Sequence, residues 1–184
     1  MKLVKKTMIA IAISSAMVAT AQAGNISYNY VDINYASFHQ SGFSESGFDV
    51  GLSAGFGNNA YFLAEHYNVN NGGDRTKVGV GYHMPLSDQS DFVAAISYRG
   101  VTNAFSQTAS GYEAEVGARM ASGSKFSFDA KVGIANVSGS SGIQLGLLAG
   151  YRVTNNVDIT ASYLNDDWWS TGLSIYKLGA RINF

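Results

Sequence analysis

The chain has 184 residues, with 12 Lys and Arg against 13 Asp and Glu, and it contains no cysteine. This near-neutral balance gives no reason to expect a nucleic-acid partner, which would call for a clustered basic surface. The absence of cysteine excludes disulfides, thiol nucleophiles and Cys-ligated metals, and nothing in the composition implies a cofactor or a metal.

The first 23 residues are expected to be a cleaved signal peptide. Three lysines stand among the first six residues, an apolar run covers 8–18, and Ala21-Gln22-Ala23 provides a small-x-small cleavage site. The apolar run is too short to cross ~30 Å of hydrocarbon as a helix. Without those three lysines, nine basic and thirteen acidic residues remain. The mature chain, 24–184, is therefore expected to be one exported domain with a net charge of −4.

Ten segments of alternating apolar and polar residues follow, and no segment shows a helical period. In the first, Tyr28 and Tyr30 share one phase while Ile33 and Tyr35 share the other, so we expect a bulge near Tyr30. The third fits either phase, and we place Glu65 inside, with Phe62 and Ala64 outside. The expected segments are 26–37, 48–56, 60–68, 77–84, 92–99, 112–120, 126–134, 144–152, 157–164 and 173–184.

The connections between these segments alternate in length. Tight turns are expected at 57–59, 87–90, 122–124 and 154–156, and longer loops at 39–46, 69–74, 100–110, 137–142 and 166–171. Short turns on one side and longer loops on the other are typical of a bacterial outer-membrane barrel. We therefore predict an all-β, up-and-down antiparallel transmembrane barrel of ten strands, with eight strands as the alternative.

The charges of the clean segments all fall opposite the apolar phase of their own strand. The apolar faces carry aromatic residues near the strand ends and aliphatic residues between them, as the girdles of a membrane barrel do. Charge facing hydrocarbon is costly, so we expect the apolar phase to face lipid and the charged phase to line the lumen. The predicted lumen charges are Asp49, Lys77, Arg99, Glu113, Glu115, Arg119, Asp129, Lys131, Lys177 and Arg181, together with Arg152 and Asp158.

The terminal strand has the most specific pattern, Tyr176-x-Leu178-x-Ala180-x-Ile182-x-Phe184. Together with the signal peptide and the alternating segments, it resembles small bacterial outer-membrane β-barrels of the OmpA-type and porin-like superfamily. In that class a terminal Phe with alternating apolar residues is the signal for the barrel-assembly machinery. The resemblance implies a monomer in a Gram-negative outer membrane, in contact with lipid and lipopolysaccharide. The familiar OmpA-type barrel has eight strands, so ten strands would depart from it.

A looser resemblance rests on the start Tyr28-Asn29-Tyr30-Val31 and the ten short strands. It is to small exported barrel proteins that were once proposed to be quorum-signal factors, and their proposed function is not carried over.

For function, we expect a largely filled lumen with paired charges and no enzymatic role, because pairing makes buried charge tolerable and ten strands lie near the filled end of barrel sizes. The alternatives are a narrow pore for ions or small solutes, a lipid- or peptide-modifying hydrolase, and a soluble periplasmic barrel. A hydrolase would need a positioned His. His66 and His83 lie in strands without a nucleophile motif, and His39 lies in an expected loop.

One loop, Asp166-Asp167-Trp168-Trp169, is unusual. Trp168 and Trp169 are candidates for a surface contact with a receptor, a sugar or lipopolysaccharide. Interfacial anchoring is the simpler role for tryptophan at a membrane boundary.

Overall fold

The computed structural model describes residues 26–40, 42–70, 73–103, 107–167 and 172–184. The expected signal peptide, Trp168 and Trp169 lie outside these ranges. The described residues form ten antiparallel strands, and they include no helix of the length and hydropathy needed to cross a membrane. The strands are β1 (Tyr30–Gln40), β2 (Phe43–Phe56), β3 (Ala60–Val69), β4 (Gly73–Ser87), β5 (Ser90–Asn103), β6 (Thr108–Ser122), β7 (Phe126–Val137), β8 (Ser140–Arg152), β9 (Val157–Asp166) and β10 (Leu173–Asn183).

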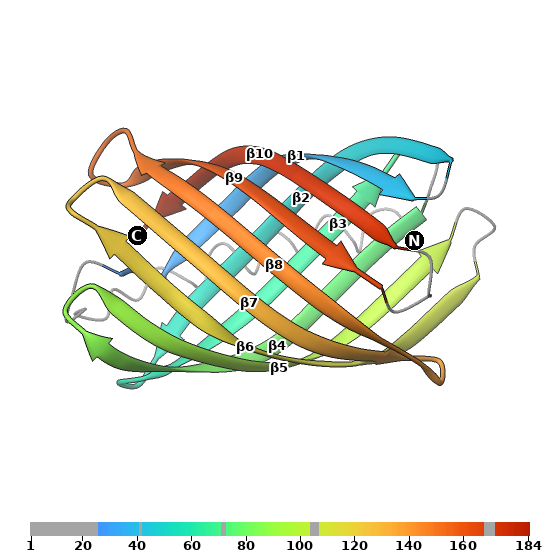
Figure 1. The fold of residues 1–184 in the computed structure, drawn as a ribbon, viewed down its shortest axis with the longest axis horizontal. Coiled ribbons are helices and arrows are strands. Elements are labelled where there is room, and N and C mark those ends of the chain that lie inside the picture. The colour runs from blue at the N-terminus through green and yellow to red at the C-terminus, as the bar shows by residue number, and fades with distance from the viewer. Residues whose placement is uncertain (1–25, 41, 71–72, 104–106, 168–171) are drawn as a thin grey trace, which may run out of the picture.

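Each strand pairs with its neighbours in the chain, and β1 pairs with β10, which closes the barrel (Figure 1). The prediction of a ten-stranded up-and-down barrel is confirmed, and the eight-stranded alternative is wrong. Closure leaves no edge strand with unpaired backbone groups. The two rims of the barrel are distinct. We call the end that holds Tyr28 and Phe184 the proximal rim, at the left of Figure 1, and the other end the distal rim.

The expected bulge near Tyr30 is absent. The β1–β10 ladder runs without a register shift from Tyr30, opposite Asn183, to His39, opposite Ser174. Tyr28 precedes the strand, and its buried side chain lies on the lumen side, as does that of Tyr30. Both tyrosines belong to the inner face, so no change of phase needs to be explained.

Two of the long loops that were expected at the distal rim are tight turns instead. At the distal rim, β1 ends at Gln40 and β2 begins at Phe43, where a loop over 39–46 was expected. Between β7 and β8 only Ser138 and Gly139 remain outside the strands, with φ of 51° and 84°. Two positive φ values are typical of a type I′ hairpin turn. The strands continue past the apolar alternation because backbone pairing does not require apolar side chains.

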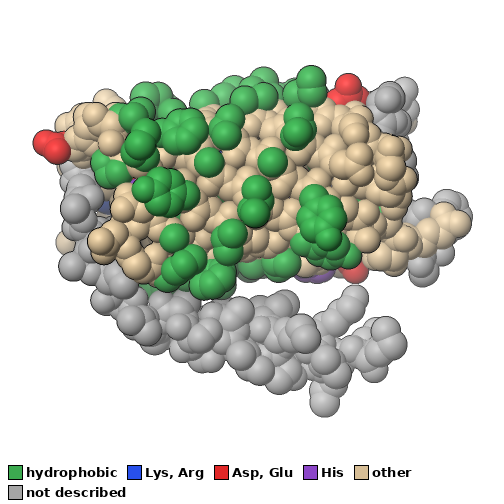
Figure 2. Space-filling model, turned by 90° about the horizontal axis from the view of Figure 1, so that it is seen from below, with side chains coloured by type: hydrophobic (Ala, Val, Ile, Leu, Met, Phe, Trp, Pro, Cys, Tyr) green, Lys and Arg blue, Asp and Glu red, His purple; other side chains and the backbone are tan. Residues whose placement is uncertain are grey.

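The barrel is apolar outside and charged inside. Large apolar side chains such as Ile96, Tyr112 and Leu178 are 62–73% exposed on the outer wall. Figure 2 shows hydrophobic side chains spread over this wall, with the few acidic side chains in view close to the rims. The phase chosen for the third segment is confirmed, since Phe62 is exposed while Glu65 contacts lumen lysines.

Candidate functional site

The lumen holds a set of paired charges. Among the described residues, ion pairs join eight Lys or Arg side chains to eight Asp or Glu side chains. The cations are Arg75, Lys77, Arg99, Arg119, Lys131, Arg152, Lys177 and Arg181, and the carboxylates are Asp32, Asp49, Glu65, Glu113, Glu115, Asp129, Asp158 and Asp166. The Lys or Arg side chains and the carboxylates that pair with them are therefore equal in number. Most of the pairs fall into three groups along the barrel axis, which we call the distal, central and proximal clusters, and the distal and central clusters share Glu113.

The distal cluster is built around Asp166, the last residue of β9. Its carboxylate accepts hydrogen bonds from Arg99, from Arg75 at 2.8 Å and from the Gln144 amide at 2.8 Å. Arg99 is fully buried, and it lies 3.7 Å from Glu113. An arginine can be held at such a depth only by carboxylates that compensate for its lost hydration.

The central cluster joins charges of β2, β3, β4, β6 and β10 through two lysines. Lys77 of β4 lies 3.1 Å from Glu113 and 3.7 Å from Glu65. Lys177 of β10 lies 2.9 Å from Glu65 and 3.1 Å from Asp49. Glu65 of β3 is therefore shared by both lysines. These side chains extend into the lumen, and the pairs of Lys177 link β10 to β2 and β3, so they occupy part of the space that a channel would need.

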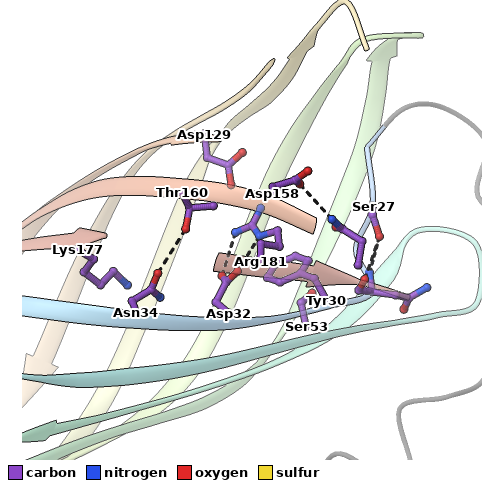
Figure 3. A network of polar contacts seen from close by, with 12 residues as sticks. Ser27, Tyr30, Asp32, Asn34, Ser53, Asp129, Asp158, Thr160, Lys177 and Arg181 are labelled. Carbon is purple, nitrogen blue, oxygen red and sulfur yellow. Dashed lines mark hydrogen bonds and ion pairs between the residues drawn. The ribbon is translucent and has the colours of Figure 1, made fainter. Parts of the chain in front are cut away.

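The proximal cluster is built on two bidentate arginine pairs. Arg119 of β6 contacts Asp129 of β7 at 2.8–3.0 Å. Arg181 of β10 contacts Asp32 of β1 at 2.8 and 3.0 Å, and its guanidinium carbon lies 3.8 Å from the centre of the Tyr30 ring (Figure 3). Bidentate geometry and ring stacking both restrict the guanidinium, so these arginines are fixed in position.

The segment that precedes β1 fills part of the proximal mouth. Tyr28 is buried, donates its hydroxyl to Asp91 at 2.7 Å and stacks on the His83 ring at 4.0 Å between centroids. Its carbonyl accepts a hydrogen bond from the Ser53 hydroxyl at 2.7 Å. Burial raises the pKa of Tyr28, so the hydroxyl stays protonated and remains a donor.

Apolar side chains fill the lumen near the distal rim. Phe38, Tyr67 and Ile175 are buried there together, and a second buried group contains Ala135 and Val137, both of β7. Between the rims a cavity of about 160 Å³ remains, lined by charged and aromatic side chains of the central and proximal clusters. Glycine and aliphatic side chains of β7 and β8 complete the lining of this cavity.

The structure places all ten predicted network charges on the inner face, each in an ion pair. Sequence reasoning did not include Asp32, Arg75 and Asp166 in that network, and it placed Glu65 inside the barrel without counting it among the network charges. Arg75 lies two residues before Lys77 and therefore shares its inward phase, and this spacing could have identified Arg75 as a lumen charge. Asp166 was assigned to a surface loop and lies buried in the lumen instead, because β9 continues to that residue.

The histidines lie away from the central lumen charges. His83 lies at the proximal mouth, 3.3 Å from Asp91. His66 faces outward and contacts the Thr76 hydroxyl at 2.9 Å. His39 belongs to β1 rather than to a loop. The described part of the chain contains no group of three or more His, Cys, Asp or Glu that could hold a metal ion.

Comparisons with known proteins agree on the fold. No family model matches this sequence, and no curated protein matches it. Among solved structures, KdgM porin is 12% identical, with a TM-score of 0.51 over 83% of this chain and 99% of the porin. NanC porin is also 12% identical, with a TM-score of 0.53 over 83% of this chain and 100% of the porin.

A third similar structure is the COG4313 outer membrane channel from Pseudomonas putida F1. It is 8% identical, with a TM-score of 0.53 over 91% of this chain and 100% of the channel. The chain therefore has the closed antiparallel barrel fold found in outer-membrane porins and channels.

Proposed function

We propose that this chain is an integral barrel of a bacterial outer membrane whose lumen is closed by paired charges. Its role would be to support the envelope or to present its distal rim at the cell surface, rather than to transport solutes. The lumen charges are engaged with one another, so we assign no chemistry to the lumen itself.

The membrane location is supported by the composition of the outer wall. Contiguous exposed apolar surface of this extent is unusual for a water-soluble monomer. Exposed aromatic residues lie towards both rims of the barrel. Along β10 and its end, Tyr176 marks the distal aromatic level and Phe184 the proximal one, eight positions apart. At ~3.4 Å per residue and a tilt of ~40°, these levels are roughly 20 Å apart, close to the ~25 Å apolar band of membrane barrels.

The closed lumen is the observation that carries the proposed role. Lys177 of β10 spans two intervening strands to reach Glu65 of β3, which is also paired with its cross-strand neighbour Lys77, and the buried Arg99–Asp166 pair lies distal to them. Opening a path would disturb a connected network, in which Glu65 contacts both lysines and Lys77 also contacts Glu113 and Glu115. Breaking one buried pair typically costs about 3–5 kcal/mol, which opposes spontaneous opening.

Planar-bilayer recording tests this proposal. The purified protein is first shown to be assembled by heat-modifiable gel migration and recovery in the outer-membrane fraction. We expect no reproducible single-channel steps from this preparation. Tyr67→Ala, which removes a buried ring from the distal lumen, is expected to introduce steps, whereas Tyr35→Ala on the outer wall is the matched control and should stay silent.

A narrow pore is the second candidate function. The similar structures are named as porins or a channel, and a polar cavity lies at the centre of this lumen. If the unmodified protein gives reproducible steps and Lys177→Gln changes their size or ion selectivity, the pore is correct and the closed barrel is wrong.

A further inference from the structure

A serine–histidine constellation lies on the outer wall at the distal rim. The inward side chains of β1 here are Ala36 and Phe38, both buried, so Ser37 and His39 face outward. The Ser37 hydroxyl lies 2.9 Å from Nε2 of His39. On β2, Ser44 lies directly opposite His39, and its hydroxyl is 3.3 Å from Nδ1. Both ring nitrogens therefore contact hydroxyl groups.

This arrangement fits a nucleophile and its base. When Nδ1–H donates to Ser44, the Nε2 lone pair is free to accept the proton of the Ser37 hydroxyl. That is the relation between serine, histidine and an orienting third group in hydrolases that act through a serine nucleophile. The third group here is a hydroxyl, which can accept the hydrogen bond from Nδ1–H and orient the ring without adding a negative charge.

The level of the site in the barrel indicates the substrate class. On the same outward face, the next rings towards the barrel centre are Tyr35 and Phe48, which are 52% and 60% exposed and contact each other edge to face. The ring of His39 itself lies 5.6 Å from that of Tyr176. Aromatic rings of a membrane barrel mark the lipid interface. The esters that join acyl chains to a lipid headgroup lie at that same level.

We propose that Ser37 and His39 are catalytic residues of an acyl-ester hydrolase site for membrane lipids, a proposal that rests on the membrane location proposed above. The Ser37 oxygen attacks the ester carbonyl while Nε2 of His39 takes the hydroxyl proton. The alcohol leaves with that proton, and the acyl group remains on Ser37. Water then gives its proton to His39 as its oxygen attacks the acyl-enzyme, which releases the fatty acid and returns the proton to Ser37.

Polar donors flank the proposed nucleophile. Ser46 lies opposite Ser37 across the β1–β2 ladder, and the Asn70 amide lies 3.4 Å from the Ser46 hydroxyl. Directly opposed residues of an antiparallel pair have side chains in contact distance. We assign to Ser46 and Asn70 the stabilisation of the developing oxyanion.

A covalent probe tests the site directly. The full-length protein in detergent micelles is treated with a long-chain fluorophosphonate, and the labelled residue is identified by mass spectrometry. We expect label on Ser37, none in Ser37→Ala, and at least a tenfold slower reaction in His39→Ala. Two surface controls should label normally. Ser87→Ala removes another surface serine that forms a hydrogen bond. His66→Ala removes another surface histidine whose ring contacts a hydroxyl group.

A second measurement uses phosphatidylglycerol vesicles that contain the protein. Fatty acid release above the Ser37→Ala background is expected. If heat-modifiable protein shows no label on Ser37, or if His39→Ala labels at the unmodified rate, the proposed site is wrong. If Ser37 labels in micelles but the protein is absent from the outer-membrane fraction, the site stands and the membrane location fails.

Discussion

At the residue scale, Asp166 is the carboxylate on which the distal lumen depends. It compensates two arginines, Arg75 and Arg99, and also accepts a hydrogen bond from Gln144. Asp166→Asn keeps the shape of the side chain and removes its charge. We expect it to lower the free energy of unfolding by about 3–5 kcal/mol, because Arg99 would be left buried beside a neutral amide.

Urea unfolding of the protein in detergent, followed by tryptophan fluorescence and gel migration, measures this loss. Asp88→Asn, in the exposed turn between β4 and β5, is the matched control and should change stability by less than ~0.5 kcal/mol. Equal stability of the two variants would contradict the role assigned to Asp166.

Glycine residues on the inner face leave space in the lumen for aromatic side chains. A Cβ added at Gly81 would overlap the ring of Tyr61, whereas a Cβ at Gly146 would meet only a Leu164 methyl at 3.8 Å. Gly81→Ala should therefore destabilise the barrel by about 1–3 kcal/mol through overpacking. Gly146→Ala is expected to be close to neutral. Thermal conversion of the compact gel band compares the two, and equal midpoints would be evidence against a filled proximal lumen.

At the element scale, β10 both closes the barrel and presents an apolar face. It pairs with β1 on one side and β9 on the other, and the Phe184 amide donates to the Asn29 carbonyl at 3.1 Å. Removing Phe184 takes away this seam bond and the aromatic residue proposed as the assembly signal. We expect lower outer-membrane levels on immunoblots of fractionated cells, with Asp88→Asn as the control.

The free-energy cost of a charged side chain on the lipid-facing side of β10 should depend on its depth in the membrane. Leu178 lies two positions from Tyr176 at the distal aromatic level, and Ala180 lies nearer the middle of the band. Arginine costs ~2–4 kcal/mol at the midplane and less towards the interface. We therefore expect Ala180→Arg to impair refolding into vesicles more than Leu178→Arg does, while Leu178→Ile folds normally. The reverse order would place the membrane midplane elsewhere.

At the scale of the whole molecule, the closed ladder makes the strand order cyclic. Both ends of the described chain lie at the proximal rim, as does the turn at Asp88 and Gln89. A circular permutant that joins the old ends by a glycine linker and opens the chain at this turn keeps every strand pair. It should refold in micelles to a heat-modifiable band. Failure to do so would show that the native chain order is needed for folding.

The barrel class, the strand count and the facing of the charges could be predicted from the sequence. Alternation alone was enough to predict that Asp49, Lys77 and Lys177 point into the lumen. A strand side chain points to one of two faces, and lipid excludes charge from the outer one. The strand ends could not be predicted, because the apolar alternation stops before backbone pairing does. For that reason Asp166 and Arg75 were missed, and His39 was assigned to a loop.

What the sequence by itself determined is therefore local: the period of each strand, and which of its faces is apolar. Only the tertiary structure decided which lumen charges meet, since Lys177 of β10 and Glu65 of β3 are brought together by closure and not by sequence distance. The register of the β1–β2 hairpin placed Ser44 opposite His39 on the outer wall. A two-residue period fixes the direction of a side chain, whereas its partner is fixed by register and curvature, which are properties of the whole closed sheet.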